Sequence, residues 1–290
     1  MCSARIAPFV LLLIVAVCPL PRAWAQPPAE AAPIIDYRQR FVPVAGRQGM
    51  VVGPEKLATE IGLQVLREGG NAVDAAVATG FALAVTYPRA GNLGGGGFML
   101  IHRAGDARQT FIDYREMAPA TAAQDLFIDE SGKVDKLREY FSHQSAGVPG
   151  TVAGLLYALE KYGTISRERA LAPAIALARD GIEVSFALHF ELAARAHQLR
   201  RNAEAARLFL DEDGNARAMG SSWRQQDLAW TLEQIARKGR AGFYAGEVAR
   251  RIDSEMRRGG GLITAADLAA YEVVEREPVR GRYRGFEVVS

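Results

Sequence analysis

The stretch Pro88–Met117 has the sequence PRAGNLGGGGFMLIHRAGDARQTFIDYREM, and it decides the fold class. Two segments typical of strands, Phe98–Ile101 and Thr110–Tyr114, follow four consecutive glycines, Gly94–Gly97, and Gly105-Asp106 lies between the two segments. This arrangement favours a hairpin of two strands. Glycine lets a backbone pass close to another group or adopt a positive φ, so we interpret the four glycines as a packing element.

Helices are predicted on both sides of this stretch. The segment Gly49–Gly53 is expected to form a short buried strand, and Pro54 fits the first position of the helix that follows. Asn71 can cap a second helix, Ala72 to about Thr86, with Asp74 as its partner in a capping box. The small apolar residues of this helix suit close packing against a sheet. Helical spacing predicts further helices over residues 151–161, 166–179, 186–210, 228–236 and 248–256, and Thr264–Asp267 is another capping signature.

Residues 1–25 have the three parts of a secretory signal peptide. Arg5 supplies the positive charge, Phe9–Cys18 the apolar region, and Ala23-Trp24-Ala25 the cleavage site between small residues. The apolar run is too short to span a bilayer as a mature helix, so a retained signal anchor is the weaker alternative. We therefore expect an exported protein, periplasmic or secreted, with no membrane anchor after cleavage.

Removal of this leader changes what the composition implies. Both cysteines, Cys2 and Cys18, lie in it, which excludes disulfides, a cysteine nucleophile and cysteine metal sites from the mature chain. Arg5 and Arg22 also leave, so 33 of the 35 basic residues remain against 33 acidic ones. Basic and acidic residues are interspersed, which argues against a nucleic-acid partner. Residues 26–46 are expected to form a flexible arm before an ordered domain at 47–290.

No local pattern marks a catalytic or metal-binding residue. The glycine run has neither the spacing of a dinucleotide-binding loop nor the Lys-Ser/Thr of a Walker loop. The histidines show no zinc spacing, and Asp211–Asn215 departs from a calcium loop at its sixth and twelfth positions. Asp113 and Arg115 would share one face of a strand, and arginine suits a carboxylate ligand. From the residues alone, a structural ion pair of Arg115 with Asp113 or Glu116 is the simpler interpretation, and the pattern is that of an exported α/β scaffold.

Five stretches in the same order resemble the γ-glutamyltranspeptidase family, whose members are glutathione hydrolases. The resemblance covers about residues 49–290 and includes the final Tyr283–Phe286. The matching stretches are Glu68–Ala76, Pro88–Met99, Asp113–Pro119, Val148–Gly154, and Gly260–Thr264 with Asp267–Tyr271.

The resemblance implies an α+β N-terminal-nucleophile hydrolase fold, a four-layer αββα sandwich. In that family a precursor cuts itself into a large and a small subunit, and the new N-terminal Thr of the small subunit is the nucleophile, with its free α-amine as base. The Thr attacks the γ-glutamyl carbonyl, usually of glutathione, and water or an acceptor amine then receives the γ-glutamyl group. The implied partners are glutathione or other γ-glutamyl compounds and the chain's own small subunit, and no cofactor or metal is implied.

The resemblance also implies that residues 47–290 are an incomplete, truncated part of the large subunit. The nucleophilic Thr is expected beyond Ser290, so this chain carries no catalytic residue, and we interpret Tyr283–Ser290 as a strand within which the chain ends. One family site carries over: Arg115 is expected to bind the α-carboxylate of the γ-glutamyl group, with Asp113 orienting it. The alternatives are a related cephalosporin (glutaryl) acylase, a poly-γ-glutamate-processing enzyme, or a non-catalytic truncated remnant.

Overall fold

The computed structural model describes residues 44–290, so the predicted signal peptide and nearly all of the predicted arm lie outside the described residues. Arg47–Ser290 form one compact unit. Within the described part, no helix has both the length and the apolar composition that crossing a membrane requires.

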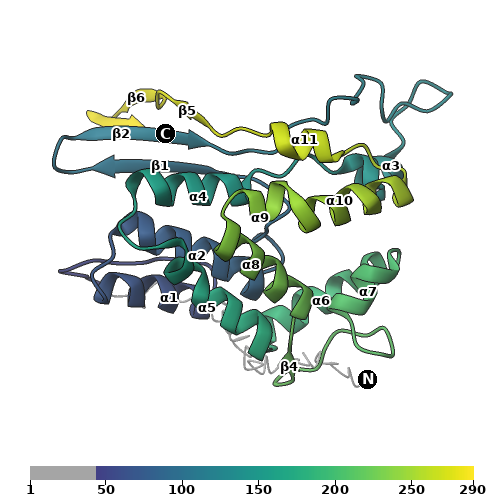
Figure 1. The fold of residues 1–290 in the computed structure, drawn as a ribbon, viewed down its shortest axis with the longest axis horizontal. Coiled ribbons are helices and arrows are strands. Elements are labelled where there is room, and N and C mark those ends of the chain that lie inside the picture. The colour runs from purple at the N-terminus through teal and green to yellow at the C-terminus, as the bar shows by residue number, and fades with distance from the viewer. Residues whose placement is uncertain (1–43) are drawn as a thin grey trace, which may run out of the picture. The chain divides into compact units, whose positions relative to one another are not determined.

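A three-stranded antiparallel sheet in the order β1-β2-β5 forms one face of this unit (Figure 1). The strands are β1 (Phe98–Arg103), β2 (Arg108–Asp113) and β5 (Val274–Arg276). The predicted hairpin is confirmed, because β1 and β2 pair along their whole length, from Phe98 opposite Asp113 to Arg103 opposite Arg108. The third strand, β5, comes from much later in the chain and pairs with the last three residues of β2.

The two faces of the sheet have different environments. Ile101 and Ile112 point to the helices and are buried. On the other face Phe98 is 51% and Leu100 42% exposed, and the Phe98 ring stacks on Phe111 with 5.4 Å between the ring centroids. The sheet therefore buries one face against the helices and leaves an apolar face uncovered by the described residues.

Helix α2 (Ala72–Thr86) lies at the centre of the helical part, as its composition predicts, and in Figure 1 the sheet, α4 and α2 follow one another from top to bottom. The capping box is confirmed: the Asn71 side chain accepts from the N–H of Asp74, and the Asp74 carboxylate accepts from the N–H of Asn71. The helices that pack on α2 are α1 (Lys56–Arg67), α4 (Thr151–Tyr162) and α5 (Arg167–Asp180).

The Asp74 carboxylate is fully buried and joins α2 to the segment before α5. Besides Asn71, it accepts hydrogen bonds from the N–H and the hydroxyl of Thr164, at 2.8 and 2.6 Å, and from the N–H of Ile165 at 3.3 Å. Burial alone would raise the pKa of Asp74, but these donors hold it below its ordinary value. The buried group is therefore an ionised carboxylate with its acceptor sites occupied.

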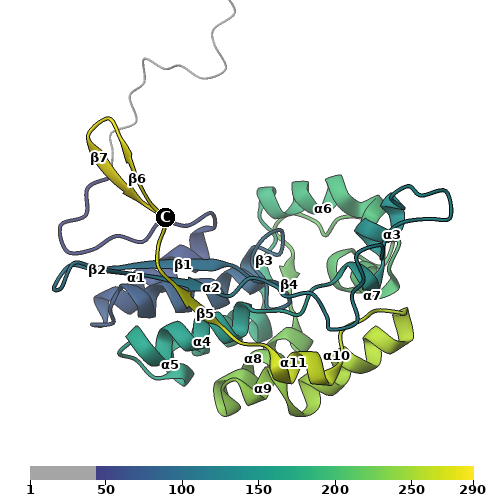
Figure 2. The ribbon, with the colours of Figure 1, turned by 90° about the horizontal axis from the view of Figure 1, so that it is seen from above.

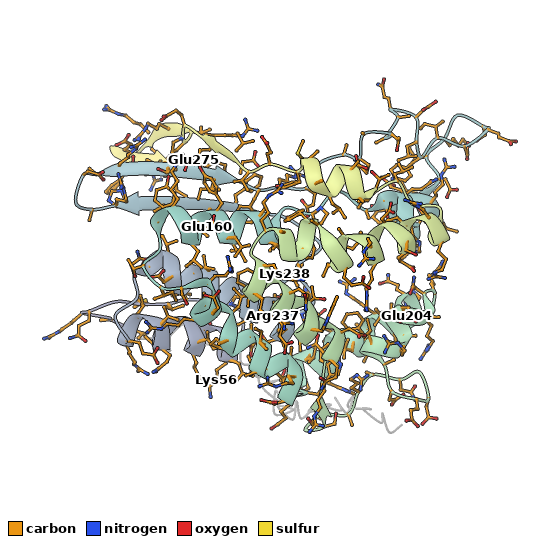
Figure 3. All side chains as sticks on the ribbon, viewed as in Figure 1. Lys56, Glu160, Glu204, Arg237, Lys238 and Glu275 are labelled. Atoms are coloured by element: carbon orange, nitrogen blue, oxygen red, sulfur yellow. The ribbon has the colours of Figure 1, made fainter. Side chains whose placement is uncertain are left out.

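The remaining elements complete an α+β architecture, as predicted. Charged side chains cover the outer helix surfaces, as Lys56 and Arg237 illustrate in Figure 3. Glu275 on β5 instead binds Lys161 and Tyr162 of α4, and this contact connects the sheet to the helices. The other elements are α3 (Lys136–Phe141), a 3-10 turn (His143–Ser145), β3 (Ile182–Glu183), α6 (Phe186–Leu199), α7 (Ala203–Phe209), β4 (Ser222–Trp223), α8 (Gln226–Lys238), α9 (Ala241–Tyr244), α10 (Gly246–Gly259), α11 (Ala265–Ala270), β6 (Arg280–Tyr283) and β7 (Phe286–Val289).

The first predicted strand is wrong. Gly49–Gly53 has no strand conformation, and Val52 is 84% exposed. A strand needs a neighbour for its main-chain groups, and none of the described segments pairs with this one. The following helix also begins later than predicted: Pro54 precedes it, and Glu55 is the N-cap, whose carboxylate accepts from two main-chain N–H groups.

Two further predictions missed a break in the chain. The helix expected over residues 186–210 is two helices, α6 and α7, because Asn202 leaves the helical conformation and caps α7. The strand expected over Tyr283–Ser290 is instead the turn and second strand of the hairpin β6–β7, which extends away from β1 and β2 in Figure 2. Arg284 and Gly285 both have positive φ, 49° and 86°, as a tight two-residue hairpin turn requires.

Candidate functional site

Arg115 is the second residue after β2, and the structure holds its main chain on both sides. Its N–H donates to Asp113 Oδ1 at 3.1 Å, and its carbonyl accepts from the Tyr271 hydroxyl at 2.9 Å. The residue before it, Tyr114, continues the ladder through two hydrogen bonds with Gly97. Arg115 itself is exposed, so a fixed main chain presents a solvent-accessible guanidinium.

Asp113 binds a partner that the sequence did not indicate. Its Oδ2 lies 2.8 Å from Arg276 Nε on β5, while Oδ1 accepts from the N–H of Arg115. Burial acts to raise the pKa of Asp113, but the bonds from Arg276 and Arg115 and the charges of both arginines hold it below its ordinary value. No carboxylate of residues 44–290 forms an ion pair with the Arg115 guanidinium, so the simple structural pair with Asp113 or Glu116 is wrong.

Arg115 lines an open cavity of about 550 Å³. One wall is the segment Arg115–Phe127 and the other is Gln144–Gly147. The two walls are joined next to the cavity by a pair of main-chain hydrogen bonds between Met117 and Val148, of 3.1 and 2.8 Å. A guanidinium at the edge of an open cavity can bind a small anion, above all a carboxylate, through its planar set of donors.

A carboxylate on α10 anchors the second wall. His143 comes directly before this wall, and its Nε2 lies 2.8 Å from Glu255 Oε1, while Arg258 donates two hydrogen bonds to the same carboxylate. The hydrogen bonds from Arg258 and then from His143 hold the pKa of Glu255 at about 2. Glu255 therefore stays ionised through the physiological range and ties the wall to α10.

The glycine run packs against the main chain of Arg115, which confirms the packing interpretation. A methyl group on Gly96 would lie 2.6 Å from both the Tyr114 carbonyl oxygen and the Glu116 nitrogen. The carbonyl of Gly95 accepts from the N–H groups of Gly150 and Thr151 at the start of α4, at 2.7 and 3.0 Å. The run thus brings α4 and the Arg115 segment together at distances that a side chain would prevent.

Gly96→Ala is expected to lower the free energy of unfolding by about 1–3 kcal/mol, because the added methyl group overpacks the Arg115 main chain. Gly94→Ala is the matched control, since a methyl group there meets nothing within 4 Å, and its effect should stay within about 0.5 kcal/mol. Urea unfolding of both variants measures the difference. Equal effects at the two positions would show that this close approach does not constrain the chain.

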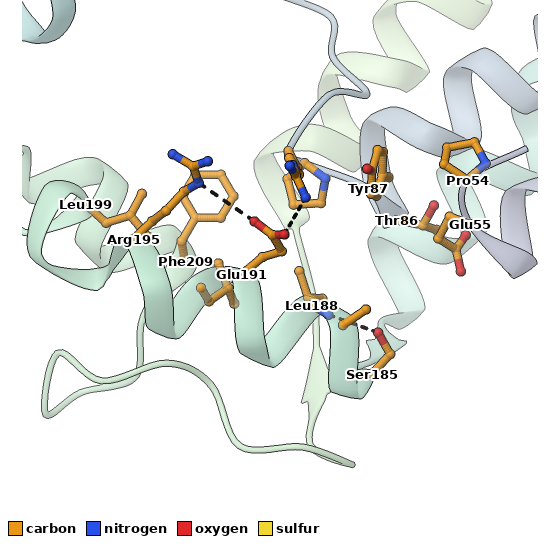
Figure 4. A pocket seen from close by; sticks show the side chains of 14 residues that line it. Pro54, Glu55, Thr86, Tyr87, Ser185, Leu188, Glu191, Arg195, Leu199 and Phe209 are labelled. Carbon is orange, nitrogen blue, oxygen red and sulfur yellow. Dashed lines mark hydrogen bonds and ion pairs between the residues drawn. The ribbon is translucent and has the colours of Figure 1, made fainter. Parts of the chain in front are cut away.

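A second cavity, of about 370 Å³, lies between α6 and the end of α2 and does not include Arg115 (Figure 4). Its walls are largely apolar, and at its edge Glu191 pairs with Arg89 and, at 3.8 Å, with Arg195. The buried Thr86 hydroxyl in its wall has no hydrogen-bond partner among the described residues. Both arginines at this cavity are already paired with Glu191, so they are less available to bind an anion than Arg115 is.

The described residues contain no group of three or more His, Asp or Glu side chains that could hold a metal ion. Sequence reasoning identified Arg115 and Asp113 but missed Tyr271 and Arg276. Both belong to segments more than 150 residues away, and only Tyr271 lies in a stretch that the motif comparison had singled out. The site is thus assembled from the end of β2, the residue after α11 and strand β5.

Comparison with known proteins gives concordant results. The family model described as gamma-glutamyltranspeptidase matches residues 58–290. The chain is 47% identical to a glutathione hydrolase proenzyme of Escherichia coli over 268 aligned residues. The alignment covers 92% of this chain and 46% of that protein. The crystal structure of Helicobacter pylori gamma-glutamyltranspeptidase superposes with a TM-score of 0.83 at 42% identity, covering 86% of this chain and 71% of that one.

A more distant relative has a different name. The acylase ACY 1 proenzyme of a Pseudomonas strain, SE83, is 36% identical over 269 residues, which is 91% of this chain and 48% of that protein. The chain therefore spans about half the length of the curated relatives that it matches.

Proposed function

Since the chain belongs to the γ-glutamyltranspeptidase family, we propose that it is part of an enzyme that cleaves the γ-glutamyl amide of glutathione and related compounds. The γ-glutamyl group passes to water in hydrolysis or to an acceptor amine in transpeptidation. The observation that carries this proposal within the chain is Arg115, whose exposed guanidinium lines an open cavity while its main chain is held on both sides.

Arg115 binds the α-carboxylate of the γ-glutamyl group in this proposal. The guanidinium offers two parallel N–H donors to a carboxylate, and such a charge-assisted bond contributes roughly 1.5–3 kcal/mol. Asp113 does not compete for the Arg115 side chain because its carboxylate is already bound to Arg276 and to the main chain of Arg115. Asp113 therefore orients Arg115 through its main chain.

The nucleophile in this proposal is the N-terminal Thr of a small subunit encoded beyond Ser290 and released when the precursor cuts itself. The Thr hydroxyl gives its proton to the free α-amine and attacks the γ-glutamyl carbonyl, and the amine of the leaving group takes up the proton as the amide bond breaks. Water or an acceptor amine then attacks the acyl-enzyme and regenerates the hydroxyl. The precursor is exported to the periplasm or secreted after cleavage of residues 1–25.

The exposed sheet face supports the four-layer αββα arrangement. Phe98, Leu100 and Val274 share this face and are each at least 42% exposed, although they lie on strands whose other face is buried. A second sheet packs about 10 Å from the first in such folds and buries side chains of this kind. In this proposal the second sheet comes from polypeptide outside residues 44–290.

A glutaryl acylase is the second candidate, and the similarity to an acylase proenzyme favours keeping it. The two activities differ at the α-amino group, because a glutaryl group keeps the carboxylate that Arg115 would bind and lacks only the amine. Comparing γ-glutamyl-p-nitroanilide with glutaryl-p-nitroanilide as substrates of the whole protein separates them. Faster cleavage of the γ-glutamyl compound supports the proposed function, and the reverse order supports the acylase.

The 290-residue chain alone is expected to release no nitroaniline from γ-glutamyl-p-nitroanilide above the uncatalysed rate, because the nucleophile lies outside it. The protein expressed from the complete reading frame is expected to release it, and a Thr→Ala variant at the start of its small subunit serves as the control without a nucleophile. Absorbance of the freed nitroaniline measures all three. Turnover by the 290-residue chain would place the nucleophile within these residues and overturn this assignment.

A further inference from the structure

We propose that Tyr271 is a positioning residue for substrate binding: its hydroxyl fixes the main chain of Arg115 and thereby directs the guanidinium toward the α-carboxylate of the γ-glutamyl group. This inference rests on the proposed function and adds a residue to it that does not touch the substrate. Tyr271 is the C-cap residue of α11 and lies 156 positions after Arg115 in the chain.

The contact between the two residues is direct and partly buried. The Tyr271 hydroxyl donates to the Arg115 carbonyl at 2.9 Å, and only 2% of Tyr271 is exposed. Burial, together with the charges of Asp113 and Glu116, raises the pKa of Tyr271 to about 12. The hydroxyl therefore keeps its proton and remains a donor at every pH at which the enzyme would work.

Two hydrogen bonds act together on Arg115. Asp113 holds the N–H, which belongs to the peptide plane before Cα, and Tyr271 holds the carbonyl, which belongs to the plane after it. Since each peptide unit is planar, fixing the two planes fixes φ and ψ of Arg115 and so the direction of its Cα–Cβ bond. Loss of either bond removes one of the two side-chain restraints on these rotations.

The surroundings of Tyr271 leave its hydroxyl little freedom. A methyl group on Gly150 would lie 2.1 Å from this hydroxyl oxygen, so the tyrosine tip occupies space that only a glycine leaves open. The ring stacks on Tyr244 with 5.7 Å between centroids, and the Arg240 guanidinium donates to the Tyr271 carbonyl and lies over the Tyr244 ring. The donor to Arg115 is thus itself held at its ring and at its main chain.

Tyr244→Phe provides a matched control for Tyr271→Phe. Tyr244 is equally buried and belongs to the same aromatic stack, but its hydroxyl donates to the Pro149 carbonyl at 2.8 Å and accepts from the N–H of Ala153 at 3.2 Å. Both variants lose one buried hydroxyl and keep the ring. A general loss of stability therefore appears in both, whereas a loss of Arg115 positioning is specific to Tyr271→Phe.

The test uses the whole, processed enzyme with two donors, γ-glutamyl-p-nitroanilide and γ-aminobutyryl-p-nitroanilide, which lacks only the α-carboxylate. Tyr271→Phe is expected to raise KM for the γ-glutamyl donor roughly three- to tenfold, the range of one neutral hydrogen bond, without a change in kcat. Its kcat/KM for the aminobutyryl donor should equal that of the unmodified enzyme. Tyr244→Phe should leave the ratio of the two donors unchanged, even where its melting temperature falls.

Arg115→Ala, measured with the same two donors, separates the positioning role of Tyr271 from the proposed binding of the α-carboxylate by Arg115. If Arg115→Ala loses the preference for the γ-glutamyl donor and Tyr271→Phe does not, the positioning role is wrong and the proposed function stands. If Arg115→Ala keeps that preference, the carboxylate assignment itself is wrong. Should Tyr271→Phe not fold, Arg240→Met, which frees the Tyr271 main chain, must show the same selective rise in KM, and its absence overturns the inference.

Discussion

Arg115→Ala in the whole protein is expected to raise KM for γ-glutamyl-p-nitroanilide by roughly tenfold to over a hundredfold, with a smaller effect on kcat. This range corresponds to the roughly 1.5–3 kcal/mol that a hydrogen bond to a charged group contributes. No carboxylate of the described residues forms an ion pair with the Arg115 guanidinium, so no such pair has to break when substrate binds. Initial rates over a range of substrate concentrations give both constants.

Two further variants make this result specific. Arg115→Lys keeps the charge but loses the planar pair of donors, so its KM should lie between those of the unmodified enzyme and Arg115→Ala. Arg103→Ala removes an exposed arginine of the same hairpin that pairs with Asp106, and it should leave KM unchanged. A KM unaffected by Arg115→Ala would instead show that this arginine does not bind the carboxylate of the substrate.

Asp74→Ala is expected to cost at least about 3 kcal/mol of unfolding free energy, the largest effect on stability predicted for this chain. The substitution leaves buried donors of Asn71, Thr164 and Ile165 without an acceptor, and each such group costs about 1–3 kcal/mol. Asp135→Ala is the matched control, because Asp135 also caps a helix, α3, but is only half-buried, and about 0.5–2 kcal/mol is expected there. Comparable urea midpoints for the two variants would contradict this account.

The same carboxylate predicts how stability depends on pH. The pKa of Asp74 is lower in the folded protein than its unfolded value of about 3.9, so the unfolded state binds the proton more readily. Its contribution to stability is therefore fully present above that value and is lost as the pH falls through the folded pKa. The difference in unfolding free energy between the unmodified protein and Asp74→Asn should be constant from neutral pH to about pH 5 and shrink below it.

The parts of the fold that sequence predicts well are those that local interactions determine. Asn71 with Asp74, and Thr264 with Asp267, are capping boxes whose members lie three residues apart, and both form as predicted. Gly49–Gly53 has the composition of a strand, but a strand exists only with a neighbour, and composition carries no information about one. The turn at Arg284-Gly285 was missed because arginine is an unusual residue at a position with positive φ.

The residues of the candidate site also differ in how well the sequence predicts them. The motif comparison identified Arg115 because the residues around it are contiguous in the chain. Its supports, Tyr271 and Arg276, come from the residue after α11 and from β5, and only tertiary structure brings them to β2. The sequence indicated that Tyr271 belongs to a matching stretch, yet nothing near it in the chain indicated which group its hydroxyl would bind.

The late position of β5 in the chain has a consequence for biosynthesis. Arg115 leaves the ribosome 156 residues before Tyr271, so the nascent chain carries Arg115 long before this support exists. Closing so long a loop is slow and adds little stability until the last contacts form. The contacts of Tyr271 and Arg276 around β2 are therefore expected to form late, and a half-made chain lacks both.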